Sequence, residues 1–370
     1  MMTADIIVIG AGIAGASVAA HLARDRKVVV LEMEERPGYH STGRSAATYE
    51  PNYGPPSIRA LTRASRGFFE TPPQGFAAAP LVSPRETIFV VPDHQREHAE
   101  SLLKTGLDFA EIPYAEARRK FPPLRETYAS LAMLDATTAD IDVDLLHQGF
   151  LRMAKTQGGE IICRAPAETI ARREGAWHVA TPQGTFSAPV LINAAGAWGD
   201  VIAGLAGVQP KGLQPKRRSM AVVPVPPDAN VMAWSFVGDA GETWYAKPSG
   251  GRLLVSPAEA EPVEPHDAYA DDMTLAEGLA RFEEAVDIEV TRLEGSWGGL
   301  RSFVPDGNPV CGFDGEAEGF FWLIGQGGYG IQTSPALGEL AAALVRGAGM
   351  PGYIEREGLK LQDISPARFN

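Results

Sequence analysis

Three glycines near the N-terminus and one acid downstream have the types and spacing of a nucleotide-binding site. The motif Gly10-x-Gly12-x-x-Gly15 directly follows a β-branched run, and Glu32 ends a second apolar run. Gly10 permits a tight turn, Gly12 lets the backbone approach a pyrophosphate, and Gly15 lets a helix pack closely on the strand. Because the Glu32 carboxylate can accept hydrogen bonds from ribose hydroxyls, the stretch predicts a dinucleotide site; a structural glycine turn is the alternative.

A second glycine-rich motif lies near the C-terminal end. Residues 326–330 read QGGYG, and an apolar helical pattern follows. Backbone N–H groups at a helix N-terminus carry partial positive charge, and bare backbone lets a ligand come close to them. The motif therefore suits a ligand that carries negative charge, and a plain glycine turn is again the alternative.

Residues 36–47, RPGYHSTGRSAA, form a loop that is long for a strand-to-helix connection, which usually has about 2 to 6 residues. The loop is rich in small and hydroxyl side chains. We interpret it as a second wrap around a bound cofactor, and a flexible surface loop is the alternative.

Strands and helices that could position these motifs occur at the start, the middle and the end of the chain. The expected buried strands are 6–9, 27–31, 159–163, 190–193 and 320–324, and the expected helices are 13–23, 143–156 and 331–345. Strand 190–193 ends in AAGAW, whose small residues allow close approach to a cofactor. The pattern predicts the α/β class, with a discontinuous Rossmann-like cofactor domain (1–47, 140–210 and 295–370) and an inserted, antiparallel sheet-rich substrate domain (48–139 and 211–294).

The composition of the chain limits the classes of partner that it can be expected to bind. The chain has 370 residues, a length that suits two domains, and a net charge of -13, which disfavours nucleic acid and anionic membranes. Cys163 and Cys311 lie far apart, so neither a disulfide framework nor a zinc site is expected. No run is long and apolar enough to span a membrane, and we expect a cytoplasmic protein.

Two acidic or histidine-rich stretches do not predict a metal site. His94, Glu97 and His98 fit the H-x-x-E-H pattern but lie in a strongly charged helix. The stretch DIDVD, 140–144, lacks the glycine and late glutamate of a calcium loop, and Asp142 fits a helix N-cap instead. No serine stands in a G-x-S-x-G motif, which excludes that class of hydrolase.

Five segments, taken in order, resemble the D-amino-acid oxidase family of FAD-dependent oxidoreductases: GAGIAGAS, LEMEERPGYHSTGRSAA, VLINAAGAW, GLRSFVPDGNPV and GQGGYGIQTS. GYHSTGRSAA, GLQPKRRS and QGGYGIQTS are most similar to the D-arginine dehydrogenases within that family. The resemblance covers essentially the whole chain and implies a glutathione-reductase-type FAD-binding fold. It also implies that QGGYG lies beside the part of the flavin that gains negative charge on reduction.

The resemblance implies non-covalent FAD, because Cys311 lies past the position near Leu300 where a relative with a flavin–thioether link carries its cysteine. The expected cofactor-binding residues are Gly10, Gly12, Ala14, Gly15, Glu32, Met33, Ser41, Thr42, Gly43, Arg44, Ser45, Ala46, Ala47, Thr48, Ala167, Gly196, Trp198, Gly327, Gly328, Tyr329, Gly330, Ile331 and Gln332.

A carboxylate-bearing substrate calls for a bidentate arginine. The resemblance implies that Arg301 and Arg218 contact or surround the substrate carboxylate, whereas Arg217 points to the opposite face of its strand. Tyr53 and Tyr245 match the tyrosines that cover the substrate; surface salt bridges and packing are the alternative roles. Gly299 and Gln332 complete the expected catalytic set.

The chain departs from the D-arginine dehydrogenases at two positions. Thr48 and Thr87 stand where a histidine and a glutamate help to recognise the cationic side chain. We therefore expect a preference for neutral or aromatic side chains, supported by the apolar surface of Trp234, Phe236 and Trp244. In the alternative, Glu86, Glu50 or Asp239 supplies the missing charge.

These observations predict oxidative deamination of D-amino acids to 2-oxo acids and ammonia, with hydride transfer from the substrate Cα to flavin N5. The alternatives are oxidation of glycine or an N-methyl amino acid, and a flavin-binding subunit without turnover. The electron acceptor can be a quinone, another carrier or oxygen, and the sequence does not distinguish these three.

Overall fold

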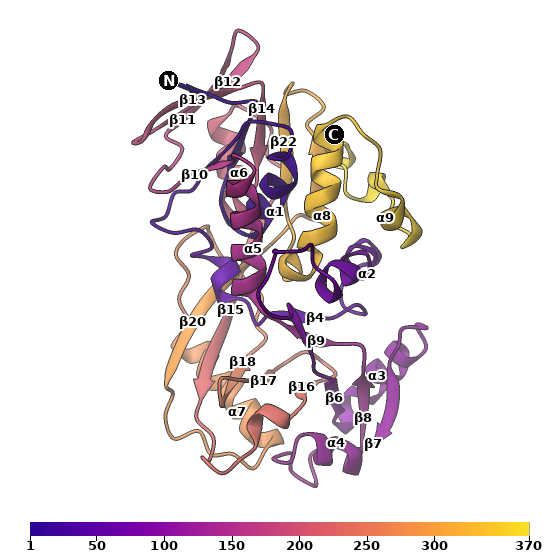
Figure 1. Cartoon of the computed structure of the whole chain (residues 1–370). Coiled ribbons are helices and arrows are strands. Elements are labelled where there is room, and N and C mark those ends of the chain that lie inside the picture. The colour runs from indigo at the N-terminus through magenta and orange to yellow at the C-terminus, as the bar shows by residue number, and fades with distance from the viewer. Residues whose placement is uncertain (370) are drawn as a thin grey trace.

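The computed structural model describes residues 1–369, which form two stacked regions, each built around a large sheet (Figure 1). The upper region in Figure 1 holds a six-stranded sheet in the order β10-β3-β2-β14-β22-β21. Its strands are β2 (Ile6–Ile9), β3 (Val28–Leu31), β10 (Glu160–Ile162), β14 (Val190–Asn193), β21 (Val310–Phe313) and β22 (Phe320–Ile324). All neighbouring pairs are parallel except β21 with β22. The α/β class predicted from the sequence is confirmed.

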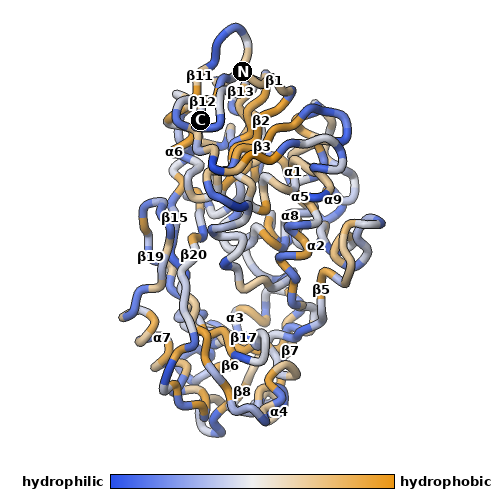
Figure 2. Tube along the Cα trace, turned by 60° about the vertical axis from the view of Figure 1, so that its left-hand side comes forward, coloured by the Kyte–Doolittle hydropathy of each residue, from blue (hydrophilic) through white to orange (hydrophobic). Residues whose placement is uncertain are grey.

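Both faces of this sheet are covered, which explains its unbroken apolar strands. Ile6 and Val8 of β2 face a core that includes α1 (Ile13–Leu22), α5 (Val143–Thr156) and α8 (Gly330–Val345). Ile7 and Ile9 face a second core that includes a small sheet in the order β1-β13-β12-β11. The small sheet consists of β1 (Met2–Thr3), β11 (Thr169–Arg173), β12 (Ala176–Thr181) and β13 (Gly184–Ala188). Figure 2 shows β2 and β3 as hydrophobic segments inside the upper region.

The lower region holds a nine-stranded sheet in the order β19-β15-β18-β17-β16-β6-β8-β7, with β20 paired to β15. The strands are β6 (Thr87–Val91), β7 (Ala110–Pro113), β8 (Leu131–Asp135), β15 (Gln214–Val223), β16 (Phe236–Asp239), β17 (Tyr245–Ser249), β18 (Arg252–Ser256), β19 (Glu261–Pro262) and β20 (Gly295–Phe303). Only β16 and β6 pair in parallel. Residues of α4 (Tyr114–Lys120) and α7 (Asp272–Ala285) pack with this sheet in a core of its own.

The long pair β15 and β20 positions the arginines named above. Arg218 lies opposite Gly299, and Lys216 lies opposite Arg301. Because side chains alternate along a strand, this register places Arg218 and Arg301 on one face of the pair and Arg217 on the other. β20 pairs within the lower sheet, and the domain boundaries given above stay a prediction.

The remaining elements are short or peripheral. A three-stranded sheet, β4-β9-β5, consists of β4 (Thr48–Tyr49), β5 (Val82–Pro84) and β9 (Ala139–Ile141). The other helices are α2 (Pro56–Glu70), α3 (Arg96–Leu103), α6 (Gly199–Leu205) and α9 (Gly352–Arg356). Asp142 caps α5, because its carboxylate accepts from the Leu145 N–H at 2.9 Å. In residues 1–369 no helix has the length and apolarity of a membrane span, and no three or more His, Cys, Asp or Glu side chains are grouped so that they could hold a metal ion.

Candidate functional site

One continuous pocket connects the two sheets. Its lining begins with the end of β2 and the start of α1, includes the 38–46 loop and the turn after β14, and extends to β15, β17, β20 and the start of α8. Most of the residues expected to bind cofactor or substrate lie along it: Gly10, Gly12, Ala14, Glu32, Met33, Ser41, Thr42, Arg44, Ser45, Ala46, Ala167, Gly196, Trp198, Arg218, Tyr245, Gly299, Arg301, Gly327, Gly328, Gly330 and Ile331. The pocket brings together sequence motifs that are about 300 residues apart.

The first glycine motif forms a cradle of bare backbone. Gly10 has φ +98°, and a Cβ there would lie 2.6 Å from the carbonyl oxygen of Ala194. A Cβ on Gly15 would lie 1.9 Å from the carbonyl oxygen of Gly10, so α1 packs directly on the turn. Gly12 is the N-cap of α1 and offers no side-chain cap; the Ile13 N–H donates to the Thr42 hydroxyl at 3.0 Å, and the other N–H groups of the first turn remain for a phosphate group. The geometry fits a pyrophosphate.

Glu32 is fixed by the backbone around it. Its carboxylate accepts hydrogen bonds from the N–H groups of Ala11 at 2.8 Å and Glu34 at 3.0 Å. A carboxylate has about four acceptor positions, so two remain for a ligand in the pocket that Glu32 lines. This arrangement fits a ribose with free hydroxyls.

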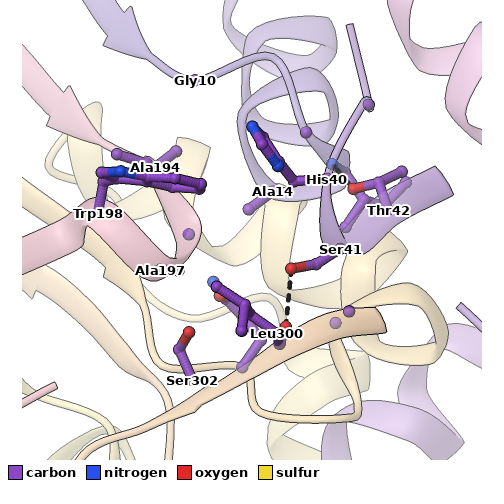
Figure 3. Close-up of a pocket in the computed structure, with 18 of the residues that line it drawn as sticks. Gly10, Ala14, His40, Ser41, Thr42, Ala194, Ala197, Trp198, Leu300 and Ser302 are labelled. Atoms are coloured by element: carbon purple, nitrogen blue, oxygen red, sulfur yellow. Dashed lines mark hydrogen bonds between the residues drawn. The ribbon is translucent and has the colours of Figure 1, made fainter. Parts of the chain in front are cut away.

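The loop 36–47 is held in place by β20 and is not a free surface loop. The Ser41 hydroxyl donates to the carbonyl of Leu300 at 2.7 Å, the dashed line in Figure 3. Arg44 donates to the carbonyls of Ala268 at 2.7 Å and Gly298 at 3.1 Å. Trp198, from the turn after β14, also lines the pocket and contacts the loop, since the centroid of its ring is 4.6 Å from that of His40.

The second glycine motif makes room for neighbouring side chains as well as for a ligand. A Cβ on Gly327, where φ is +55°, would lie 2.3 Å from the Phe303 ring. A Cβ on Gly328 would lie 2.9 Å from Nη1 of Arg301. The bare backbone at the start of α8 is therefore needed partly because the Arg301 guanidinium lies against it.

Two arginines create a strongly positive end of the pocket. Burial tends to lower the pKa of Arg301, but Tyr245, Tyr53, Tyr329 and Glu50 together raise it, so the guanidinium stays charged. Burial and the charge of Arg301 lower the pKa of Arg218, whose Nε donates to the carbonyl of Glu259 at 2.7 Å. Two neighbouring cations favour an anionic ligand between them.

Two tyrosines accompany these arginines. The Tyr245 hydroxyl is buried and has no hydrogen-bond partner within residues 1–369, and its ring stacks on Phe236 at 5.4 Å. Tyr53 donates to the Glu242 carboxylate at 3.1 Å and packs edge-on against Tyr329 at 5.2 Å. A buried hydroxyl without a partner is rare in native proteins, so Tyr245 has a donor available for a ligand.

Seven predicted residues lie behind the lining: Gly15, Gly43, Ala47, Thr48, Tyr53, Tyr329 and Gln332. Gly43 lies against the backbone of Gly38, and the carbonyl of Ala47 accepts from Lys247 at 3.0 Å. Gln332 is buried and holds the backbone of Glu50. These residues support the wall, and their direct contact with a ligand stays a prediction.

The residues proposed to set side-chain preference do not all face the pocket. The expectation that Trp244 offers apolar surface to the substrate is wrong, because Trp244 is 1% exposed and packs on Phe282 at 5.6 Å in the core of the lower region. Trp234 packs on Phe121 at 5.2 Å. Thr87 is fully buried, and its hydroxyl donates to that of Thr138 at 3.0 Å.

Of the three acids proposed as alternatives, two are engaged elsewhere. Glu86 pairs with Lys120, and Asp239 accepts hydrogen bonds from Gln95, Thr243 and Trp244. The third acid, Glu50, forms no ion pair within residues 1–369; burial raises its pKa to about 7, and the charge of Arg301 opposes that rise.

Sequence reasoning missed several lining residues. They include Ala165, Pro166, Met220, Leu300, Ser302 and Gly325, whereas Gly38, Tyr39, His40 and Gln326 were expected only as members of the loop 36–47 and of the QGGYG motif. Met220 could have been found by its position, since it follows Arg218 by two residues and therefore lies on the same face of β15.

Comparison with known proteins agrees with this geometry. The FAD dependent oxidoreductase family matches residues 5–344. The chain is similar to a glycine oxidase of Bacillus licheniformis, with 25% identity over 93% of each chain. It also resembles the FAD-dependent oxidoreductase domain-containing protein 1 of Xenopus laevis, with 24% identity over 99% of this chain and 82% of that protein.

Solved structures show the same fold. A glycine oxidase from Geobacillus kaustophilus superposes with a TM-score of 0.83 at 21% identity, over 94% of this chain and 96% of that one. An L-proline dehydrogenase from P. horikoshii superposes with a TM-score of 0.84 at 20% identity, over 100% of this chain and 98% of that one. An iminodiacetate oxidase from Chelativorans sp. BNC1 superposes with a TM-score of 0.82 at 22% identity, over 98% of each chain.

Proposed function

The chain belongs to the FAD dependent oxidoreductase family, and from that premise we propose that it oxidises D-amino acids to imino acids, which water converts to 2-oxo acids and ammonia. FAD binds along the pocket, and we propose that it is held non-covalently. Neither cysteine is among the pocket-lining residues of the described chain, and Cys311 is buried in the upper core. When bound, FAD supplies the acceptor for the hydride that leaves the substrate Cα.

The positive end of the pocket carries this proposal. Arg301, Arg218 and Tyr245 converge where the lining of the two sheets meets, and the Tyr245 hydroxyl has no partner within residues 1–369. Arg301 binds the substrate carboxylate through two parallel hydrogen bonds, and Tyr245 donates a third. A substrate anchored by its carboxylate has a defined Cα position, which is the requirement for hydride transfer.

We further propose that neutral or aromatic side chains are preferred over cationic ones. The support is Thr48, which lies behind the lining and cannot offer a charge to it. Thr87, Trp244 and Phe236 add no support, because all three are buried and none lines the pocket; Phe236 only stacks behind Tyr245.

A second candidate function is oxidation of glycine or a secondary amine. The similar proteins named above are called glycine oxidase, L-proline dehydrogenase and iminodiacetate oxidase. All three names specify an amine next to a carboxylate, a chemistry that the same arginine pair could hold.

One experiment separates these candidates. The purified holoprotein is mixed anaerobically with D- and L-amino acids, glycine, N-methylglycine and iminodiacetate, and the bleaching of the flavin band is followed. We expect D-methionine and D-phenylalanine to bleach the flavin faster than D-arginine. Bleaching only by glycine or secondary amines favours the second candidate, and absence of bleaching by every amine contradicts both.

The state of the cofactor is tested separately. Acid precipitation of the protein should release all flavin into the supernatant. A yellow pellet would contradict non-covalent binding.

A further inference from the structure

We propose that the Glu50 carboxylate contacts the substrate's amino group and accepts a proton from it before the Cα–H bond breaks. This inference rests on the proposed function and adds to it a proton acceptor.

The backbone places Glu50 beside the second glycine motif. Its N–H donates to Oε1 of Gln332 at 2.8 Å, and Nε2 of Gln332 donates to its carbonyl at 3.4 Å. Gln332 is 3% exposed and lies in the first turn of α8, directly after the pocket residues Gly330 and Ile331. Two hydrogen bonds to one buried side chain fix the position of Glu50 relative to the motif on which the Arg301 guanidinium rests.

The strand direction turns the Glu50 side chain away from the core. Tyr49, the preceding residue, is 6% exposed and packs edge-on against Phe69 at 5.8 Å in the upper core. Because side chains alternate along an extended chain, Thr48 and Glu50 lie on the other face. Thr48 and Glu50 are both partly exposed, whereas Tyr49 between them is buried, which agrees with that placement.

Glu50 is not among the lining residues, but its hydrogen bonds to Gln332 fix it beside the start of α8, where Gly328 lies against the Arg301 guanidinium, and the charge interaction with Arg301 agrees with that position. Glu50 and Arg301 each act on the pKa of the other, and both act on the pKa values of Tyr53 and Tyr329. Burial raises the pKa of Glu50 to about 7, Arg301 opposes the rise, and Asp135 and Glu242 add to it. The titratable groups that face Glu50 are therefore Arg301, Asp135, Glu242, Lys247, Tyr53 and Tyr329.

The neighbouring charged groups already have partners. Asp135 accepts from Asn52 at 2.9 Å, and Glu242 accepts from Tyr53 at 3.1 Å. Lys247 pairs with Asp140 at 2.9 Å. Glu50 therefore combines coupling to Arg301 with a carboxylate that forms no ion pair within residues 1–369, and it can bind a cation that arrives with the substrate.

The chemistry of an amino acid brings such a cation. Its amine and its carboxylate are bonded to the same carbon, so a carboxylate held by Arg301 places the ammonium a few ångströms from the guanidinium. One N–H bond of the ammonium breaks, and the proton moves to a Glu50 oxygen. The nitrogen lone pair then forms the C=N bond as the Cα hydrogen leaves with both electrons, which bound FAD accepts. A proton acceptor with a pKa near the working pH suits this step.

The test uses Glu50→Gln, with Glu86→Gln as matched control because Glu86 pairs with Lys120 away from the pocket. In the unmodified holoenzyme, the rate of anaerobic flavin reduction should rise as pH increases through about 7. Glu50→Gln should lose that rise, follow only the ionisation of the free amine, and be about 100-fold slower at pH 7. Glu86→Gln should keep the original profile.

A binding measurement provides a readout without turnover. Benzoate has a carboxylate and no amine, and its binding is followed by the flavin absorbance change. Its affinity for the unmodified protein should fall as pH rises through about 7, because the newly charged Glu50 repels it, whereas Glu50→Gln should bind it independently of pH in that range. If amino acids bleach the flavin but both pH profiles survive in Glu50→Gln, this inference is wrong and the proposed function stands. If no amine bleaches the flavin of the unmodified protein, the proposed function itself fails.

Discussion

In the function we propose, the two ends of the pocket recognise their ligands in different ways. At the cofactor end, the backbone provides most of the contacts. Gly10 and Gly12 have no side chains, and the start of α1 presents its N–H groups. At the substrate end, the side chains of Arg218, Tyr245 and Arg301 converge from three different strands. A backbone site spreads its binding energy over many weak contacts, whereas a side-chain site concentrates it in a few charged ones.

This comparison predicts where single substitutions do most harm. At the substrate end, removal of one charge leaves a carboxylate without its partner. At the cofactor end, removal of one side chain matters less, and damage comes mainly when an added Cβ collides with backbone.

Arg301→Met should raise KM by about 100-fold or more while FAD stays bound. The variant loses two charge-assisted hydrogen bonds, each with a net contribution of about 1.5 to 3 kcal/mol. Steady-state kinetics with the best amine substrate measure KM, and the flavin absorbance of the purified protein measures cofactor content. A KM within a few-fold of the unmodified value would remove Arg301 from the carboxylate site.

Arg217→Met is the matched control for that variant. Arg217 lies on the opposite face of β15 and pairs with Glu261. The same change of residue type there should leave KM nearly unchanged. A large rise in KM for both variants would mean that general loss of positive charge, and not a specific contact, explains the effect.

Gly10→Ala should weaken FAD binding by about 10- to 100-fold. The residue has φ +98°, where an alanine is strained by about 1 to 3 kcal/mol, and its Cβ would lie 2.6 Å from a backbone oxygen that cannot move freely. Fluorescence titration of the apoprotein with FAD measures the dissociation constant. Gly67→Ala is the control, because Gly67 lies in α2 with open space around its position; FAD affinity should be unchanged there.

The same contrast explains what could be predicted from the sequence. Strands 6–9, 190–193 and 320–324 were predicted with the bounds that the structure has, because short, continuous apolar runs next to glycine motifs give a local signal. The cofactor end was equally predictable from the sequence, since one strand–helix–strand unit contains Gly10, Gly12, Gly15 and Glu32. Most residues predicted there line the pocket.

The substrate end was harder to predict because it depends on packing between distant segments. Trp244 looked like pocket surface, but tertiary packing turns it toward Phe282. Thr87 matched a specificity position, yet its hydroxyl bonds to Thr138 from a segment 51 residues away. The sequence does not distinguish Glu50 from Glu86 and Asp239, whereas in the structure Glu86 pairs with Lys120 and Asp239 accepts a hydrogen bond from Gln95. Residue spacing does not tell which way a side chain points or whether it already has a hydrogen-bond or ion-pair partner.

The smallest predicted effect lies where the two regions meet over the cofactor loop. Asp267, in the segment after β19, accepts hydrogen bonds from Arg44 and from Tyr39 at 3.2 Å, and both donors belong to the loop 36–47. The hydrogen bond from Arg44 lowers the pKa of Asp267, so the carboxylate stays charged at neutral pH. Because Asp267 is more than half exposed, the contact should contribute only about 0.2 to 1 kcal/mol.

Asp267→Asn should therefore raise the FAD dissociation constant by no more than about fivefold, and high salt should reduce the difference from the unmodified protein. Glu264→Gln is the control, since it removes a similar charge from the same exposed segment without a contact to the loop. FAD titration at low and high ionic strength measures both variants. If Glu264→Gln weakens binding as much as Asp267→Asn, the effect is one of overall charge. If Asp267→Asn weakens binding as much as Gly10→Ala, side chains matter at the cofactor end as they do at the substrate end, and the contrast between the two ends fails.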